Sequence, residues 1–280
     1  MRLPGISAAA HTMGQTNNHY TFGTSNLAAE RLVLLAKAYE APSRAFLSER
    51  PRAAVDHEID HAIDLGCGLG YTTELVHSVV QPRRMTGLDA SEKLLGEASR
   101  RLPTQLAIDW ICHDITTAPF PCAPADFLFC RFLVTHLHDA AAALRVWATA
   151  AQPGALLLIQ ETAQLESDDA FISRYYDMVG RLQAAYGQAL HIGQNLDRCL
   201  DGTGWSIRAS KCRTVDQPAA VMARLHAMNI RTWSSDAKAV TLFSAAEIAT
   251  VQSELDRIAS GERSARPVRN TLREIVASMP

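Results

Sequence analysis

The sequence lacks three features that would each assign a class of protein at once. No apolar run approaches the roughly 20 residues that a membrane-spanning helix needs. The N-terminal segment MRLPGISAAAHTMGQTNNHY has no apolar core of the kind found in a signal peptide, so we expect a cytoplasmic protein. The six cysteines are scattered without a CxxC pair, which indicates neither a disulfide framework nor a zinc site.

An excess of one charge is missing as well. The chain of 280 residues carries 27 Lys and Arg against 29 Asp and Glu, and the basic residues are spread along its whole length. Proteins that follow a nucleic-acid backbone usually gather basic residues on one surface. We therefore expect no nucleic-acid partner and no membrane partner.

Short apolar runs alternate with helical patterns between residues 59 and 161, which is typical of βαβ units and a parallel sheet covered on both faces. The predicted strands cover residues 61–65, 84–89, 106–112, 126–130 and 155–161. The predicted helices cover residues 72–80, 91–102 and 139–151. We expect Pro153 and Gly154 to end the last of these helices.

Two flanking parts complete the predicted organisation. A polar tail and a helical lid, broken at Pro42, occupy residues 1–50, and the α/β core occupies residues 51–165. Residues 166–280 are predicted to add helices and the last two strands of the sheet. The predicted elements of this part are an amphipathic stretch at 168–190, strands at 205–215 and 268–277, and helices at 218–233 and 245–259.

A glycine-rich turn follows the first predicted strand. The segment Ile63–Gly70 reads IDLGCGLG, with glycine at alternate positions between a strand and a helix. Glycine lets a backbone turn sharply and approach a ligand closely. A dinucleotide fold carries GxGxxG, and its third glycine would stand where this sequence has Tyr71. The turn therefore indicates a cofactor site, and its spacing disfavours a dinucleotide.

Two acids follow at the ends of the next predicted strands. Asp89 ends the second strand, where a carboxylate can accept hydrogen bonds from both ribose hydroxyls. Asp114 follows the third strand, where a carboxylate can accept a hydrogen bond from the exocyclic amine of adenine. Because ligands of open α/β sheets lie beyond the carboxyl ends of the strands, the three features together predict a nucleoside site.

In this order the motifs resemble those of class I, Rossmann-like methyltransferases dependent on S-adenosylmethionine (SAM), in their small-molecule branch. The resemblance covers about residues 55 to 165. It implies an α/β fold with a Rossmann-like, seven-stranded, mostly parallel sheet, helices on both faces and an N-terminal helical flap. It also implies SAM as cofactor and S-adenosylhomocysteine as product. The cofactor contacts that it implies are Asp64, Gly66, Cys67, Gly68, Asp89, Ala90, Asp114, Ile115, Cys130, Arg131 and Tyr20.

Candidates for catalysis lie after the fourth and fifth strands. Methyl transfer from a sulfonium needs positioning and, for some acceptors, a base. His136 either serves as that base or closes the turn into the next helix, and Glu161 either contacts the acceptor or caps the exit of its strand. The pair His136 and His138 has no carboxylate at ligand spacing, so we expect no metal.

Further acceptor-side candidates fall in the C-terminal part. Five residues of the amphipathic stretch either line a pocket or pack in the core: Phe171, Tyr175, Tyr176, Met178 and Tyr186. The sequence does not rank the remaining candidates, which are His191, Arg224, His226 and Trp233.

The leading hypothesis is a SAM-dependent methyltransferase that acts on oxygen, nitrogen or carbon of a small metabolite or natural-product scaffold. A nicotinamide-dependent dehydrogenase is disfavoured by Tyr71. A SAM-binding regulatory protein without turnover, and a methyltransferase acting on tRNA or protein, stay open. The identity of the acceptor and the oligomeric state, including a homo-oligomer, also stay open.

Overall fold

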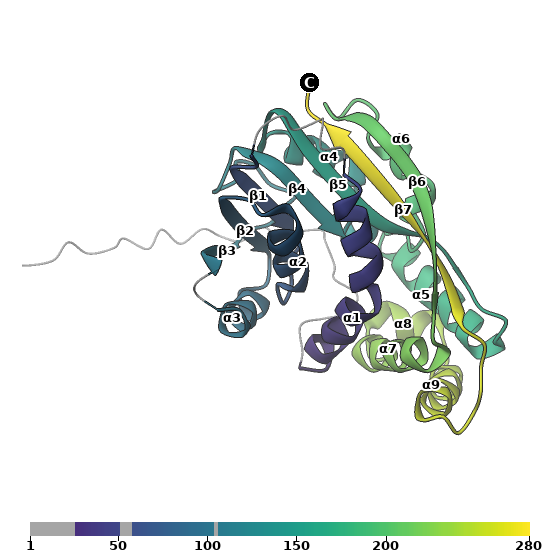
Figure 1. Cartoon of the computed structure of the whole chain (residues 1–280). Helices are drawn as coiled ribbons and strands as arrows, with labels where there is room; N and C mark the ends of the chain where they lie inside the picture. Colours follow the sequence, from purple (N-terminus) through teal and green to yellow (C-terminus); the bar gives the residue numbers. More distant parts are fainter. Residues whose placement is uncertain (1–25, 51–57, 104–105) are drawn as a thin grey trace, which may run out of the picture.

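The computed structural model describes residues 26–50, 58–103 and 106–280. Its strands form one sheet in the order β3-β2-β1-β4-β5-β7-β6, in which β1 to β5 run parallel and β7 runs antiparallel to both of its neighbours (Figure 1). The strands are β1 (His61–Leu65), β2 (Arg84–Asp89), β3 (Ile108–Cys112), β4 (Ala125–Arg131), β5 (Ala151–Glu166), β6 (Ser206–Gln217) and β7 (Val268–Ser278). The predicted fold class is confirmed.

Helices cover both faces of this sheet. They are α1 (Asn26–Ser48), α2 (Tyr71–Val80), α3 (Glu92–Arg101), α4 (Ala140–Ala148), α5 (Ala170–Ala185), α6 (Leu196–Cys199), α7 (Ala219–Trp233), α8 (Ala237–Leu242) and α9 (Ala245–Ser260). Of these, the sequence did not predict α6 and α8, which are short. The 3₁₀ turn Val134–His136 follows β4, and a second 3₁₀ turn, Ile192–Gln194, precedes α6.

Alternation along the central strands divides the sheet core into two layers. Phe127 and Phe129 of β4 pack with α1 and α2 on one face, whereas Leu128 and Cys130 pack with α4 and α6 on the other. All four side chains are fully buried. Successive side chains of a strand point to opposite faces, so a strand buried on both sides reads as a continuous apolar run.

A third cluster of buried residues joins α5, α7, α8 and α9, which lie together below the ends of β5 and β7 (Figure 1). The helix α1 packs against both α2 and α7, so it bridges the sheet core and this helical layer. A cavity lies among these elements. In the described part of the chain, no helix combines the length and the apolar character that crossing a bilayer requires.

The predicted break at Pro42 is wrong, since α1 continues through this residue. Proline has no N–H with which to bond the carbonyl four residues earlier. That carbonyl belongs to Ala38, and the side-chain amide of Gln217 donates a hydrogen bond to it. A contact from the end of β6 therefore satisfies the group that proline leaves open.

The predicted end of the helix at 139–151 is also wrong. The helix α4 begins after Asp139, whose carboxylate caps the backbone N–H of Ala142 at 2.8 Å, and it ends at Ala148. Pro153 and Gly154 lie inside the following strand β5, near its first residue. The pairing of β4 with β5 shifts register between Ala125 and Phe127, which accommodates these residues.

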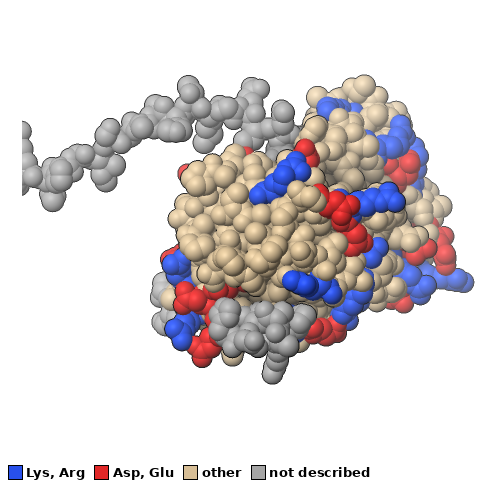
Figure 2. Space-filling model, turned by 90° about the horizontal axis from the view of Figure 1, so that it is seen from above, with Lys and Arg blue, Asp and Glu red and all other residues tan. Residues whose placement is uncertain are grey.

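Charges of both signs are interspersed on the face that Figure 2 shows, around a broad uncharged area. Several exposed guanidinium groups are paired, for example Arg83 with Glu58 and Arg231 with Asp256, each at 2.6 Å. The expectation that the protein has no nucleic-acid partner stays a prediction.

Candidate active site

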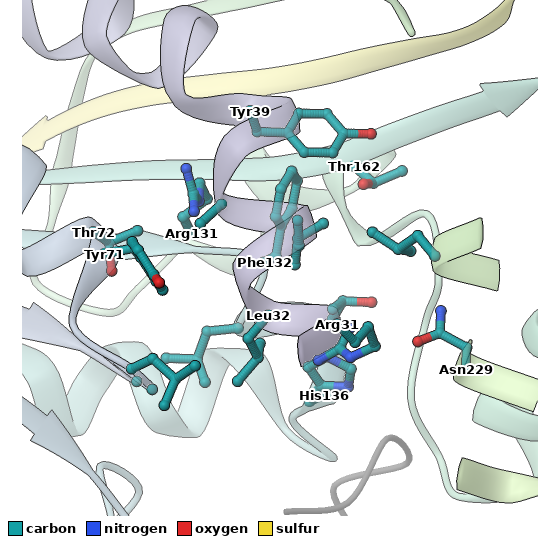
Figure 3. A pocket seen from close by; sticks show the side chains of 18 of the residues that line it. Arg31, Leu32, Tyr39, Tyr71, Thr72, Arg131, Phe132, His136, Thr162 and Asn229 are labelled. Atoms are coloured by element: carbon teal, nitrogen blue, oxygen red, sulfur yellow. The ribbon is translucent and has the colours of Figure 1, made fainter. Parts of the chain in front are cut away.

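A continuous cavity of about 580 Å³ lies along the carboxyl ends of the parallel strands. One half is lined by the loops that follow β1, β2, β3 and β4, and the other by α1, α5 and α7 (Figure 3). Its size is that of a site for a cofactor or a small ligand. We call the part lined by these loops the donor half and the part lined by the three helices the acceptor half.

The glycine turn forms the floor of the donor half. Gly66, Cys67 and Gly68 all line the cavity. Gly66 has a φ of +65°, and a Cβ there would stand 2.6 Å from Cδ1 of Leu133. Gly70 serves packing instead, because it is absent from the cavity wall and a Cβ there would stand 2.5 Å from the Trp110 ring.

Asp89 holds the turn and faces the cavity. Its Oδ2 accepts the backbone N–H of Gly68 at 2.9 Å, and its Oδ1 accepts the backbone N–H of Ser91 at 2.8 Å. Burial raises the pKa of this carboxyl, and the two backbone hydrogen bonds lower it. Each oxygen keeps a lone pair for a ligand hydroxyl. Asp89 and the adjacent Ala90 line the cavity where a ribose was predicted.

Asp114 carries an unsatisfied acceptor. Its Oδ1 accepts both the backbone N–H of Thr116 at 2.9 Å and the hydroxyl of Thr116 at 2.7 Å. Its Oδ2 is buried and has no partner in the described part of the chain. Buried polar atoms rarely go unpaired, so this oxygen is available to accept a hydrogen bond from a donor that enters the cavity. The amine of adenine is such a donor, and Ile115 provides apolar wall beside it.

Arg131 marks the other end of the donor half, near Tyr71 and Thr72 (Figure 3). Its Nη1 donates to the hydroxyl of Ser43 at 3.0 Å. Burial lowers its pKa to about 10, and the charge of Asp64 opposes that shift, so the guanidinium stays charged at neutral pH. A cation here suits the carboxylate of an amino-acid ligand.

Two predicted cofactor contacts do not reach the cavity with their side chains. Asp64 accepts hydrogen bonds from the hydroxyls of Thr72 at 2.6 Å and Thr73 at 2.7 Å, which ties β1 to the start of α2. Burial raises the pKa of Asp64 to about 6. Cys130 is fully buried in the sheet core. A third predicted contact, Tyr20, lies outside the described residues.

Glu161 is likewise absent from the cavity wall, which corrects its placement as a catalytic candidate. The side chain is fully buried, and Oε1 accepts the backbone N–H groups of Leu133 at 2.7 Å and Val134 at 2.6 Å. Burial raises the pKa of Glu161 to about 8. The residue therefore anchors the loop after β4, and the wall residues Leu133 and His136 belong to that loop.

His136 does line the acceptor half, beside Arg31 of α1 (Figure 3). Burial and, to a smaller extent, the positive charge of Arg31 lower the pKa of His136 to about 3. The imidazole is therefore neutral and only weakly basic. Arg31 itself is 3% exposed, which makes it a buried cation on the wall of the acceptor half.

The far end of the acceptor half is built by α5 and α7. Of the C-terminal candidates, Tyr175 and His226 line the cavity, and Tyr176, which does not line it, contacts His226. The others do not line it: Phe171, Met178, Tyr186, His191, Arg224 and Trp233. Met178 and Trp233 pack in the helical cluster, whereas Arg224 is exposed.

Sequence reasoning missed Arg31, Gln183, Asn229 and Asn270, which all line the acceptor half. For Arg31 a signal was present. It lies at helical spacing from Ala28 and Leu35, so it interrupts an apolar stripe with a charge. For the other three, only the packing of α5, α7 and β7 brings them to one cavity.

Comparison with known proteins agrees with the donor half. The sequence model of a methyltransferase domain matches residues 63–159, which include the glycine turn and both acids. Residues 63–159 of this chain therefore correspond to a methyltransferase domain. This match agrees with the methyltransferase family predicted from the sequence, and SAM is the cofactor that this family implies.

Curated relatives share the methyltransferase domain. A trans-aconitate 2-methyltransferase of Azoarcus sp. is 34% identical over 122 residues, which are 41% of this chain and 47% of the relative. A trans-aconitate 2-methyltransferase of Paracidovorax citrulli is 33% identical over 127 residues, which are 42% and 47% of the two chains. The matched stretch thus spans about half the length of these relatives.

The fold extends beyond the methyltransferase domain in a solved structure. A Bacillus halodurans protein, described as a methyltransferase, superposes with a TM-score of 0.57 at 14% identity and covers 85% of this chain and 99% of its own. At that identity the likeness concerns the fold alone.

Proposed function

We propose that the protein transfers the methyl group of SAM to an oxygen of a small acceptor that carries a carboxylate. The observation that carries this proposal is the buried Arg31, a cation on the wall of the acceptor half in the same cavity as the glycine turn, Asp89 and Asp114.

The donor half supplies the groups that SAM requires. The carboxylate of Asp89 would accept hydrogen bonds from the ribose hydroxyls. The unpartnered Oδ2 of Asp114 would accept a hydrogen bond from the adenine amine. Arg131 would hold the methionyl carboxylate at the opposite end. When bound, SAM supplies a methyl group that is already activated for displacement.

The acceptor half favours a nucleophile that is already anionic. Both carboxylates among the wall residues that the structure describes, Asp89 and Asp114, lie in the donor half. The two histidines of the wall, His136 and His226, each have a pKa lowered to about 3 by burial, so neither is a good base. A carboxylate oxygen can attack without losing a proton. Arg31 would hold such an acceptor by charge-assisted hydrogen bonds.

The names of the relatives point the same way. Trans-aconitate, the acceptor in the names of the Azoarcus and Paracidovorax enzymes, is a carboxylic acid. The similarity covers only about half of each relative, so the carboxylate acceptor proposed for this chain rests on the charge of its own cavity.

The test has two steps. Calorimetric titration with S-adenosylhomocysteine should show binding, and no binding at high micromolar concentration would remove the methyltransferase proposal. Methyl transfer from labelled SAM should then yield a methyl ester of at least one acid in a set that contains trans-aconitate and a series of monocarboxylic acids. Arg31→Met should raise the KM for the acid at least tenfold while the affinity for S-adenosylhomocysteine stays within about twofold.

Amine and phenol acceptors serve as the contrasting substrates. Turnover of these in preference to every acid would contradict the carboxylate proposal and leave the cofactor proposal intact. The conservative variant Arg31→Lys should recover part of the activity, because a cation persists although the paired geometry of the guanidinium is lost.

A further inference from the structure

The far end of the acceptor half carries a cluster of buried polar side chains, Tyr175, Tyr176, His226 and Asn229. Nδ2 of Asn229 donates to the hydroxyl of Tyr175 at 2.6 Å, and Nε2 of His226 lies 3.0 Å from the hydroxyl of Tyr176. The rings of Tyr175 and His226 stack with centroids 4.2 Å apart. These contacts hold the four side chains in a fixed arrangement that we call the polar cluster.

Two atoms of the polar cluster lack partners. His226 and Asn229 are each 3% exposed and both line the cavity. Nδ1 of His226 and Oδ1 of Asn229 have no hydrogen-bond partner within the described residues. Turning the amide of Asn229 over would exchange its oxygen and nitrogen, and one polar atom would still lack a partner. Such atoms carry a cost unless a ligand satisfies them.

The polar cluster is electrically neutral. Burial lowers the pKa of His136 and raises that of Tyr175, and the charge of Arg31 makes a smaller, lowering contribution to both. Burial alone accounts for the low pKa of His226. The charge of Arg31 therefore reaches Tyr175 of the polar cluster but does not affect His226. In Figure 3, Asn229 lies across the cavity from Tyr71 and Thr72, with Arg31 and His136 between them. A second carboxylate at this end would be buried among neutral groups, which is strongly unfavourable.

The remaining wall of the acceptor half is largely apolar. It is contributed by three helices and the segment before the second 3₁₀ turn, through Leu35, Val179, Leu190, Met222 and Leu225. An acceptor that fills this space needs an apolar body between its two polar ends.

From these observations we infer that the polar cluster is a subsite for a neutral hydroxyl group of the acceptor. The inference rests on the proposed function and narrows it. The acceptor class is a hydroxy acid with an apolar body, in which Arg31 holds the carboxylate and Asn229 and His226 hold the distal hydroxyl. A hydroxyl both donates and accepts, so it satisfies either state of the two unpartnered atoms. A tricarboxylate would place anions at a position where none of the described residues supplies a cation.

Binding to the protein loaded with S-adenosylhomocysteine tests the subsite without requiring turnover. Three matched series of straight-chain acids differ only at the end remote from the carboxylate, which is a hydroxyl, a methyl or a second carboxylate. At the best chain length, calorimetry should show the hydroxy acid binding roughly tenfold more tightly than the methyl-terminated acid. The dicarboxylate should bind roughly a hundredfold more weakly than the hydroxy acid.

The variant Asn229→Leu, which is close in shape to the wild type, should abolish or reverse the preference for the hydroxyl over the methyl. The matched control is Thr232→Val, which removes a hydroxyl from the same helix α7 at a position off the cavity wall. It should keep the wild-type preference. Thermal unfolding with and without S-adenosylhomocysteine verifies that each variant is folded.

The outcomes separate the two proposals. If S-adenosylhomocysteine binds and hydroxy and methyl-terminated acids bind equally at every length, the subsite is refuted while the methyltransferase proposal stands. Tightest binding of the dicarboxylates, or binding of no acid from any series, also refutes the subsite. If S-adenosylhomocysteine itself does not bind, the proposed function fails first.

Discussion

The side chain of Leu133 lies directly over the α-carbon of Gly66. A Cβ at Gly66 would stand 2.6 Å from Cδ1 and 2.8 Å from Cδ2 of Leu133, and the glycine has a φ of +65°. Leu133 is in turn held by the hydrogen bond from its backbone N–H to Glu161. The glycine turn is therefore fixed from two sides, by its own backbone conformation and by the loop after β4.

Gly66→Ala should weaken binding of S-adenosylhomocysteine at least tenfold and destabilise the fold by about 3 kcal/mol, since it combines a positive φ with a clash. Gly202→Ala is the matched control, because Gly202 has a φ of +67° and no atom within 4 Å of the added Cβ. That control should cost about 1–2 kcal/mol and leave binding unchanged. Urea unfolding and calorimetry measure the two quantities. Equal losses in both variants would show that Leu133 exerts no constraint.

Asp89→Asn should lower the affinity for S-adenosylhomocysteine by roughly 10- to 100-fold, because a charged acceptor of ribose hydroxyls becomes a neutral amide. The control Asp109→Asn removes an exposed carboxylate from β3, away from the cavity. Calorimetry on both variants, with unfolding curves alongside, gives the comparison. Wild-type affinity in Asp89→Asn would mean that the ribose binds elsewhere.

Glu161 should make stability depend on pH. Burial raises its pKa from 4.5 to about 8 in the folded state, so between these values the folded protein binds a proton that the unfolded chain has released. The contribution of this group is present in full below pH 4.5 and is lost as the pH rises toward 8. The slope is at most about 1.4 kcal/mol per pH unit.

The variant Glu161→Gln keeps an acceptor for the backbone of Leu133 and Val134 but cannot titrate. The stability difference between this variant and the wild type should therefore shift in favour of the variant as the pH rises. Unfolding measured across the window tests this, with Glu166→Gln at the exposed end of β5 as control. Parallel pH profiles for wild type and Glu161→Gln would refute the buried titration.

Glu274→Ala should destabilise the protein by about 3 kcal/mol, because Glu274 is buried and its Oε1 accepts from Gln160 at 2.8 Å and from Arg213 at 2.7 Å. The control pair lies on the same two strands, where Asp216 meets Arg269 at 3.0 Å on the surface. Asp216→Ala should cost less than about 1 kcal/mol. Similar losses in both variants would contradict the distinction between buried and exposed pairs.

The donor half was accessible from the sequence because its signals are local. The run from His61 to Gly70 combines a buried strand with a turn that only glycine allows, and Asp89 and Asp114 follow at successive strand ends. In a parallel sheet these ends lie along one edge, so the order along the chain already indicates proximity in space. The same local reasoning failed at Pro42, where a distant amide, Gln217, supplies the missing partner.

The acceptor half was decided by tertiary structure. Arg31 on α1, Asn229 on α7 and Asn270 on β7 meet at one cavity only because α1 packs between the sheet core and the helical layer. Tertiary packing likewise turned Glu161, a catalytic candidate by its place after a strand, into an anchor for the backbone of Leu133. The sequence by itself determined where SAM is expected, because glycine torsions and strand order are properties of the chain. Which groups face the acceptor depends on how helices distant in sequence pack, and no local pattern encodes that.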